Sequence, residues 1–585
     1  MSFPRFLPGV ILVLLLSVSG ARGQCPPVSG RCNCESSIYE PVSIRCDGAG
    51  SLSEVIQSIS PAKSVKIDRL VIANTPVPTL PAYAFDDFTI SALALQQNGL
   101  NRIDPMAFNG RGSDSKTLQS FTELTLQNNR LNAIPQGGVS KLPNLRKLIL
   151  RENSIGMVPP RAFSSYESKG RLEKLDLSGN QLTGIGTVSL DGLSALKEIS
   201  FEKNMFSNIP GDGLRVIRET LEDLNFGLNK ISQVPVGVLD FPALKSLSLE
   251  FNNIQSIAPE SFRRIPNLLY LYVGGNKFSR FDPEMFRYLS QLEILGIGDG
   301  NIQQIPEDAF KYTPRLRILE MSDAAVTNIQ EGAFQRIRST IQRIVMNKNE
   351  LTRIRADMFR GLTELQSLDL QGNRLTSVEN RAWSNLPALT HLDISDNDLR
   401  TLEPQTFQGT FTPRADFRTL YICGNPWTCD QRLEWFRTWL RNDLDIQIDK
   451  RPACISECAE PDFLNHLYIR DMDPVTDSPP TIPPVTAPIR QGAVMSSIGW
   501  IILAIILAIL LTSICLLAIV RYFIGRRRRQ EKERDEEEKI LRSSAVSGYH
   551  APGSVVGSAY PGSAVDLDLP PATTLDVPER SYWPY

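Results

Sequence analysis

The chain has 585 residues, a formal net charge of −2 at pH 7, and 22% charged residues. This balance lacks the basic excess of a nucleic-acid-binding protein, so we expect no nucleic-acid partner. The sequence has only three histidines and shows neither a metal-spaced cluster nor a phosphate-binding glycine loop. We therefore predict no cofactor, no metal site and no enzymatic activity.

Residues 1–23 are typical of a secretory signal peptide. Arg5 supplies a positive charge, residues 10–18 are apolar, and Ala21 and Gly23 give a small-residue cleavage site. The apolar run is too short for a transmembrane helix. We therefore expect the chain to enter an oxidising compartment, where cysteines form disulfides.

Residues 24–64 hold four cysteines directly before a long repetitive region. A stack of repeats exposes its apolar core at each end, and a small disulfide-bonded cap would cover it. We predict such a cap here. Four cysteines allow three pairings, and their spacing does not choose among them. The four are Cys25, Cys32, Cys34 and Cys46.

Residues 65–427 repeat one short phrase fifteen times: apolar, any, apolar, any, any, Asn, any, apolar. Most steps are 23 to 25 residues, which is the leucine-rich repeat signature. The apolar-x-apolar pair predicts a strand with one buried face, and stacked rungs share one core. The fold class is therefore an α/β repeat solenoid, a horseshoe of about 15 rungs with a parallel β-sheet on its concave face.

The Asn position predicts a structural role for its side chain. The amide can donate and accept hydrogen bonds where the chain leaves the strand, so it can pair buried backbone groups. Twelve rungs have Asn there, and the exceptions are Thr75, Gly300 and Ala324. On the far side of several rungs a Pro-x-x-Ala-Phe phrase, as at Pro306 to Phe310, predicts an outer turn with a buried Phe.

The residues between the apolar strand positions are expected to face the concave side. In the first half many of them are charged: Glu123, Lys147, Arg151, Lys174, Asp176, Glu198, Glu202, Asp223 and Glu250. The next three rungs instead present Tyr270, Tyr272, Gly274, Ile294, Gly296, Gly298, Ile318, Glu320 and Ser322. We interpret these as an apolar patch with room above the glycines.

The two consecutive rungs that lack Asn, at Gly300 and Ala324, fall in the same place. We therefore predict a ligand-docking site with a local change in curvature. Tolerated sequence drift beside ordinary surface residues is the alternative. The predicted ligand-binding residues are Tyr270, Tyr272, Ile294, Ile318 and Glu320.

A weaker hypothesis concerns catalysis at His391. It shares the concave face with Asp393 and with Asp369 of the neighbouring rung, and a histidine beside a carboxylate can do acid–base chemistry. No nucleophile accompanies them in the sequence, so we expect ordinary surface polarity and no catalytic residues.

Residues 423–460 predict a C-terminal cap. Its cysteines are Cys423, Cys429, Cys454 and Cys458, again with three pairings open.

The caps carry a family resemblance. Cys25-Pro26 with Cys32-x-Cys34, and Asn425-Pro426-Trp427-x-Cys429-Asp430 with Leu433-x-Trp435, resemble the cysteine caps of animal extracellular proteins that consist of leucine-rich repeats. The resemblance implies the pairs Cys25–Cys34 and Cys32–Cys46. The C-terminal cap departs from the family pattern, because Gln431 stands where a cysteine is usual and Cys423 lies upstream, so its pairing stays open.

The remaining segments predict a single-pass membrane protein. Residues 461–497 form a Pro- and Thr-rich stalk, and 498–520 are uncharged and long enough to span the lipid bilayer. Arginines at 521 and 526–529 place the tail, 521–585, in the cytoplasm. Its composition predicts disorder. The terminus at Tyr585 fits a PDZ-type adaptor.

These features predict a type I plasma-membrane protein with its N-terminus outside. The resemblance implies adhesion or organisation of extracellular matrix through extracellular or cell-surface protein ligands. One alternative is a receptor that signals through adaptors on its tail. The other is a non-catalytic partner subunit of an extracellular enzyme.

Overall fold

The computed structural model describes residues 25–111, 117–384, 386–411, 418–442 and 445–471. The chain divides into two compact units, 1–481 and 482–585, and everything described belongs to the first. The predicted signal peptide 1–23, bilayer span 498–520, tail 521–585 and PDZ-type terminus at Tyr585 lie outside the described residues. None of the described helices combines the length and the apolar composition that a bilayer span requires.

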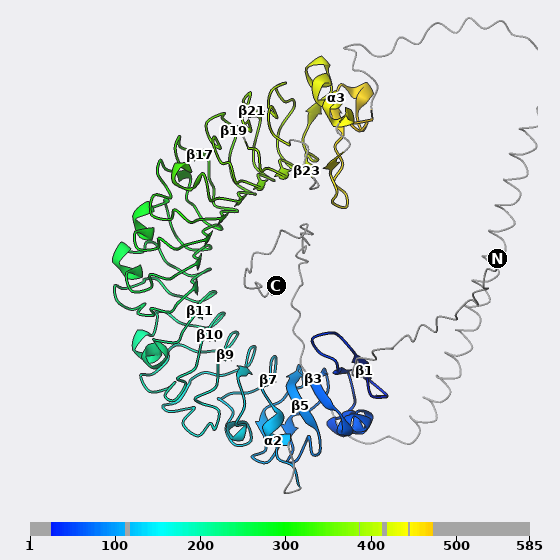
Figure 1. Cartoon of the computed structure of the whole chain (residues 1–585), viewed down its shortest axis with the longest axis vertical. Helices are drawn as coiled ribbons and strands as arrows, with labels where there is room; N and C mark the ends of the chain where they lie inside the picture. The colour runs from blue at the N-terminus through cyan, green and yellow to red at the C-terminus, as the bar shows by residue number, and fades with distance from the viewer. Residues whose placement is uncertain (1–24, 112–116, 385, 412–417, 443–444, 472–585) are drawn as a thin grey trace, which may run out of the picture. The chain divides into compact units, whose positions relative to one another are not determined.

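An 18-stranded sheet forms the concave side of the solenoid (Figure 1). Each of the fifteen predicted rungs supplies one strand, and neighbouring rungs pair in parallel. This confirms the predicted leucine-rich repeat solenoid. The rung strands are β3 (Lys66–Ala73), β5 (Thr89–Gln96), β7 (Glu123–Thr125), β8 (Lys147–Ile149), β9 (Lys174–Asp176), β10 (Glu198–Ser200), β11 (Asp223–Asn225), β12 (Ser246–Ser248), β13 (Tyr270–Tyr272), β14 (Ile294–Gly296), β16 (Ile318–Glu320), β18 (Arg343–Val345), β20 (Ser367–Asp369), β22 (His391–Asp393) and β23 (Arg418–Tyr421).

Strand alternation explains which side chains enter the core. In β12 Leu247 is fully buried, while Ser246 and Ser248 on either side are partly exposed. The same alternation holds in β13, where Leu271 is buried between two partly exposed tyrosines. Successive side chains of a strand point to opposite faces, so each rung contributes its middle residue to the shared core.

The asparagines pair buried backbone groups, as predicted, and they do so across neighbouring rungs as well as within their own. Asn180 Nδ2 donates to the carbonyls of Leu177 and Ser178 in its own rung and to Leu150 in the rung before. Its Oδ1 accepts from the backbone N–H of Ile155, 2.9 Å away, also in the rung before. Each of these backbone groups is buried. The column of asparagines, called the Asn ladder below, therefore provides hydrogen-bond partners for groups that water cannot reach.

Phenylalanines fill the outer half of the core, as the Pro-x-x-Ala-Phe phrase predicts. Phe310, Phe334 and Phe359 stack in succession, with ring centroids 5.7 and 5.9 Å apart. The outer side holds short elements: β4 (Thr79–Leu80), β6 (Arg102–Ile103), α2 (Thr117–Ser120), η2 (Val139–Lys141), η3 (Gly211–Ile217), η4 (Pro259–Phe262), η5 (Pro283–Phe286), β15 (Gln304–Ile305), β17 (Asn328–Ile329), η6 (Gln335–Ile337), β19 (Arg353–Ile354) and β21 (Ser377–Val378).

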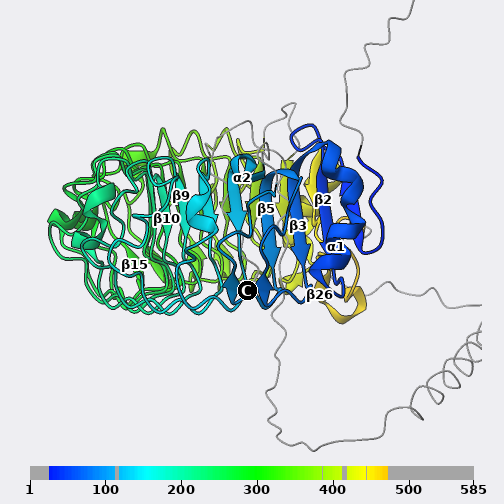
Figure 2. The same ribbon diagram turned by 90° about the horizontal axis from the view of Figure 1, so that it is seen from below.

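The N-terminal cap begins the sheet with the antiparallel pair β1 (Cys32–Glu35) and β2 (Ser43–Asp47), and β2 then pairs in parallel with β3. Helix α1 (Leu52–Ser58) and η1 (Ser60–Ser64) follow at this end of the solenoid (Figure 2). Ser51 caps α1 by accepting from the Glu54 N–H. The disulfides are Cys25–Cys34 and Cys32–Cys46, as the family resemblance implies.

The C-terminal cap ends the sheet with β25 (Ile446–Ile448), which pairs with β23. Its disulfides are Cys423–Cys454 and Cys429–Cys458, which selects one of the three pairings left open by the sequence. The other elements are β24 (Trp427–Thr428), η7 (Gln431–Leu433), α3 (Glu434–Asn442), β26 (Cys458–Glu460) and η8 (Asp462–Leu464).

The cap extends past the predicted boundary at residue 460. Ile469 is fully buried, and the Cys458 N–H donates to the Leu467 carbonyl, 2.9 Å away. Residues 461–471 therefore belong to the cap. The first part of the segment predicted as a stalk, 461–497, is folded as part of that cap.

Candidate functional site

The outward strand positions form continuous rows across the concave face. In one row Asp223, Ser246, Tyr270, Ile294 and Ile318 stand opposite one another on neighbouring strands. The next row runs Asn225, Ser248, Tyr272, Gly296 and Glu320. The five predicted ligand-binding residues thus lie on three adjacent strands, β13, β14 and β16, as their spacing in the sequence predicts.

The predicted apolar patch is less open than expected. Ile294 and Ile318 are 4% and 7% exposed, so they pack among their neighbours and present almost no surface. The space above Gly296 is also occupied, since a Cβ built on this glycine would lie 2.8 Å from Tyr272 Cδ1. The prediction of room above the glycines is wrong, because a neighbouring aromatic ring fills the space that the missing side chain leaves.

The other glycines serve close packing of rungs. A Cβ on Gly298 would lie 2.3 Å from the Ser322 carbonyl oxygen, and one on Gly274 would lie 3.0 Å from the Gly298 carbonyl oxygen. Side chains at these positions would force three successive backbones apart. The glycines in this stretch are therefore explained by backbone approach.

The break in the Asn ladder has a local repair. In regular rungs the N–H two residues after Asn donates to the next rung's Asn, as Ile254 does to Asn276 Oδ1. Ile302 instead donates to the backbone carbonyl of Ala324, 2.8 Å away. Strands β13, β14, β16 and β18 stay paired in register through these rungs. The predicted change in curvature has no counterpart in the strand pairing.

The rows on the N-terminal side of the tyrosines are polar and partly buried. Asp223 stands opposite Ser246 of β12, and Asn225 donates to Glu202 Oε2, 3.3 Å away. Burial raises the pKa of Asp223, and it is also the largest cause that raises the pKa of Glu202. Both carboxylates therefore sit where the charged form is poorly hydrated.

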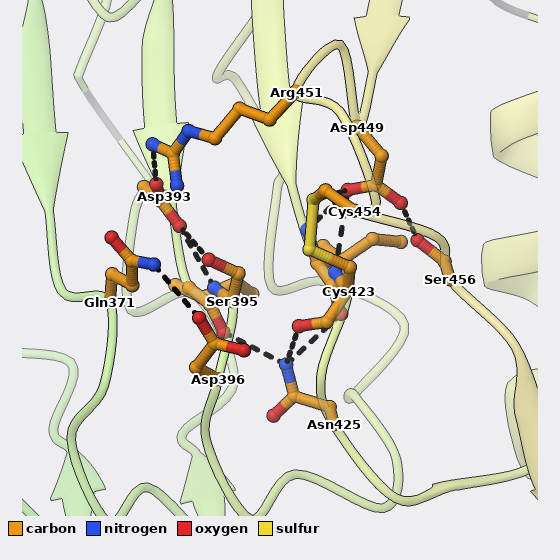
Figure 3. The surroundings of a disulfide bond; sticks show 12 residues. Gln371, Asp393, Ser395, Asp396, Cys423, Asn425, Asp449, Arg451, Cys454 and Ser456 are labelled. Atoms are coloured by element: carbon orange, nitrogen blue, oxygen red, sulfur yellow. Dashed lines mark hydrogen bonds and ion pairs between the residues drawn. A yellow bond between two sulfur atoms is a disulfide. The ribbon is translucent and has the colours of Figure 1, made fainter. Parts of the chain in front are cut away.

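The C-terminal end of the concave face is covered by a loop of the cap. This loop follows β25, and the Cys423–Cys454 disulfide ties it to the segment directly after β23 (Figure 3). Arg451 reaches from the loop to Asp393 on β22 and forms an ion pair with it. The Arg451 guanidinium also lies 4.1 Å from the centroid of the Tyr421 ring, which is a cation–π contact.

Two carboxyl groups near this loop titrate far from their usual range. Burial, together with the nearby Asp393 charge, raises the pKa of Asp369 to about 6. Burial also raises the pKa of Asp449 to about 6, although Asp449 Oδ1 accepts from the Ile422 N–H, 2.9 Å away. The sequence does not reveal this cluster, because Arg451 and Asp393 are 58 residues apart.

The geometry gives no support to acid–base chemistry at His391. Asp393 is fully buried and engaged by Arg451 and by Ser395, whose Oγ donates to it at 2.6 Å. The His391 ring packs edge-on against Tyr421, with centroids 5.5 Å apart, and burial lowers the pKa of its imidazole. Asp393, the carboxylate that acid–base chemistry at His391 would need, thus already forms an ion pair with the cap loop.

Among the described residues, one group places three potential metal-binding side chains close together: Cys423, Asp449 and Cys454. Both sulfur atoms belong to one disulfide. A disulfide offers no thiolate, which is the form of cysteine that binds metals, so this group does not fit a metal ion.

Comparison with known proteins identifies the repeats. The family described as Leucine rich repeat matches residues 119–168, 242–299, 314–375, 339–399 and 364–410, and a second description, Leucine Rich Repeat, matches 171–193. The chain carries leucine-rich repeats, and the matched families describe a repeat and no catalytic activity.

Several curated relatives share this region. Human "Leucine-rich repeats and immunoglobulin-like domains protein 1" is 26% identical over 270 residues, or 45% of this chain and 21% of the relative. Keratocan of Danio rerio is 28% identical over 256 residues, or 43% of this chain and 60% of the relative. The matched regions thus span about a fifth and three fifths of these relatives.

Solved structures show the same fold. A leucine-rich repeat protein of Leptospira interrogans superposes with a TM-score of 0.53 at 22% identity, covering 69% of this chain and 93% of that protein. At this identity the likeness establishes the solenoid fold alone.

Proposed function

We propose that this protein recognises a macromolecular ligand at the cell surface, for adhesion or for organising extracellular matrix, through the concave face of its solenoid. One observation carries the proposal. The outward rows of β7 to β18 contain partly exposed charged and aromatic side chains, and no described helix or strand lies over them (Figure 1). Curved repeat sheets of this kind provide extended binding surfaces.

The four disulfides support an extracellular setting, since such bonds persist in oxidising compartments. The relatives named above share the repeats with this chain, but their names do not identify a ligand. Anchoring by residues 498–520, with the solenoid outside and an adaptor at Tyr585, completes the proposal.

The chain contains no Asn-x-Ser/Thr sequon, which allows a sharp test of the concave face. Gly227→Thr would make Asn225 of β11 a glycosylation acceptor in the middle of that face. Gln255→Thr would do the same for Asn253, which lies outside the outward strand positions. The full chain, displayed on cells, is first screened against extracellular proteins.

We expect the glycan at Asn225 to abolish binding of the ligand found, and the glycan at Asn253 to leave it unchanged. Equal binding by both glycosylated variants would contradict the use of the concave face. Deletion of residues 526–585 then separates adhesion from signalling, because an adhesion protein keeps its cell-binding activity without its tail.

A further inference from the structure

The concave face changes character between β11 and β13. Two carboxylates of the acidic side, Asp223 and Glu202, lie to one side of a row of small residues, Ser246 and Ser248 of β12. The two tyrosines of β13 lie on the other side, and both are partly exposed. Serine side chains are short, so the tyrosine and carboxylate side chains project further from the sheet on either side of them.

Charge on this surface is unbalanced. The outward positions of the rungs that contain β10 to β12 present four carboxylates, Glu198, Glu202, Asp223 and Glu250, and no cation. Arg151, in the rung that contains β8, is close enough to Glu202 to oppose the rise in its pKa. Lys174 of β9 is already engaged, since its Nζ lies 2.7 Å from Glu198 Oε2. A cationic group from outside would therefore meet a negative surface whose carboxylates are partly desolvated.

Spacing selects the kind of cation. Neighbouring strands are about 4.8 Å apart, so Asp223 and Tyr270 are separated by about 10 Å with Ser246 between them. A cation placed above Ser246 lies about 5 Å from each, which is within the range of a cation–π contact. A guanidinium fits better than an ammonium, because its plane stacks on a ring while its edge donates to a carboxylate.

We propose that the face over β11 to β13 binds an arginine-bearing segment of a protein ligand, with the guanidinium between the tyrosines and the carboxylates. The proposal rests on the proposed function and names the chemistry of its ligand. It moves the centre of recognition from Ile294 and Ile318, which are buried, towards Asp223 and Ser246.

The test uses the full-length chain and three short synthetic peptides in which Arg, Lys or Glu alternates with Ser. We expect the Arg peptide to bind most tightly, and Tyr270→Ser with Tyr272→Ser to weaken it by about tenfold. Glu331→Gln with Glu364→Gln controls for loss of negative charge in the Asp223→Asn variant below, because it removes two exposed carboxylates elsewhere and should leave affinity unchanged.

Asp223→Asn provides a second variant, which removes the charge and keeps the shape of the side chain. It should weaken the Arg peptide and lower the salt dependence of its binding. Equal affinity for the Lys and Arg peptides, or unchanged affinity in either variant, would overturn the proposal. A protein ligand that is blocked by the glycan at Asn225 but does not compete with the Arg peptide would overturn this inference and leave the proposed function standing.

Discussion

Asn180 shows how much one side chain of the ladder contributes. Replacing it with Ala removes four hydrogen bonds and leaves the buried N–H of Ile155 without its acceptor. We expect Asn180→Ala to lower the free energy of unfolding by about 2–3 kcal/mol. Urea unfolding checks this, with Asn208→Ala as the control, because Asn208 is exposed and donates only to Ser207. Equal losses in both variants would contradict a structural role for the ladder.

Asp369 makes a pH-dependent contribution at the same scale. Its carboxyl has a folded pKa of about 6, above the ordinary 3.8, so the fold binds the proton more tightly than the unfolded chain does. Its charge therefore costs stability above pH 6, by up to about 3 kcal/mol, and this cost disappears as the pH falls towards 4.

We accordingly expect Asp369→Asn to raise Tm at pH 8 and to give a much smaller rise at pH 4. Asp449 and His391 titrate in both proteins, so they largely cancel in the difference between variant and parent. A rise of the same size at both pH values would show that the effect of the substitution is not electrostatic.

At the scale of elements, the loop after β25 depends on Arg451. Arg451→Gln would leave the fully buried Asp393 carboxylate without its ion-pair partner, at a cost of about 3–5 kcal/mol. Repeat proteins lose stability locally. Hydrogen exchange should therefore accelerate in residues 446–471 and stay unchanged in β7 to β12.

Arg400→Gln is the matched control for this prediction. Arg400 pairs with Glu460 of the same cap at 2.8 Å, but both side chains are more than half exposed. An exposed pair contributes at most about 1 kcal/mol. Faster exchange of the cap in Arg400→Gln than in Arg451→Gln would contradict the assignment of the loop's anchor.

At the scale of the whole solenoid, the uniform strand register predicts tolerance to loss of a complete rung. Deleting residues 350–373 joins Asn349 to Arg374, and it keeps the phase of the repeat because Asn373 is the next ladder residue. We expect this variant to reach the cell surface and to unfold within a few degrees of the parent. Deleting residues 350–361 breaks the phase and should abolish surface display. Equal surface display of the two would contradict a register-determined fold.

The same scale shows what the sequence can and cannot predict. Positions of Leu, Asn and Phe repeat with the rungs, so the strand of every rung, the ladder and the outer aromatic stack follow from local spacing. The burial of Ile294 and Ile318 does not, because it depends on side chains of neighbouring strands. The repeat pattern also does not predict the Arg451–Asp393 ion pair, because this pair joins a cap loop to a rung 58 residues earlier.

The backward reach of the asparagines has a consequence for biosynthesis. Each one completes the rung before it, so a rung that has just emerged from the ribosome stays unfinished until its successor arrives. Domains generally form from the N-terminus during synthesis. The solenoid should therefore form in one direction during translation, and each rung should be stabilised by hydrogen bonds from the rung that follows it. The rungs that contain Phe278 and Ile302 are followed by rungs with Gly300 and Ala324 in place of Asn. At these two points the next rung has no Asn side chain to accept a hydrogen bond from the rung before it.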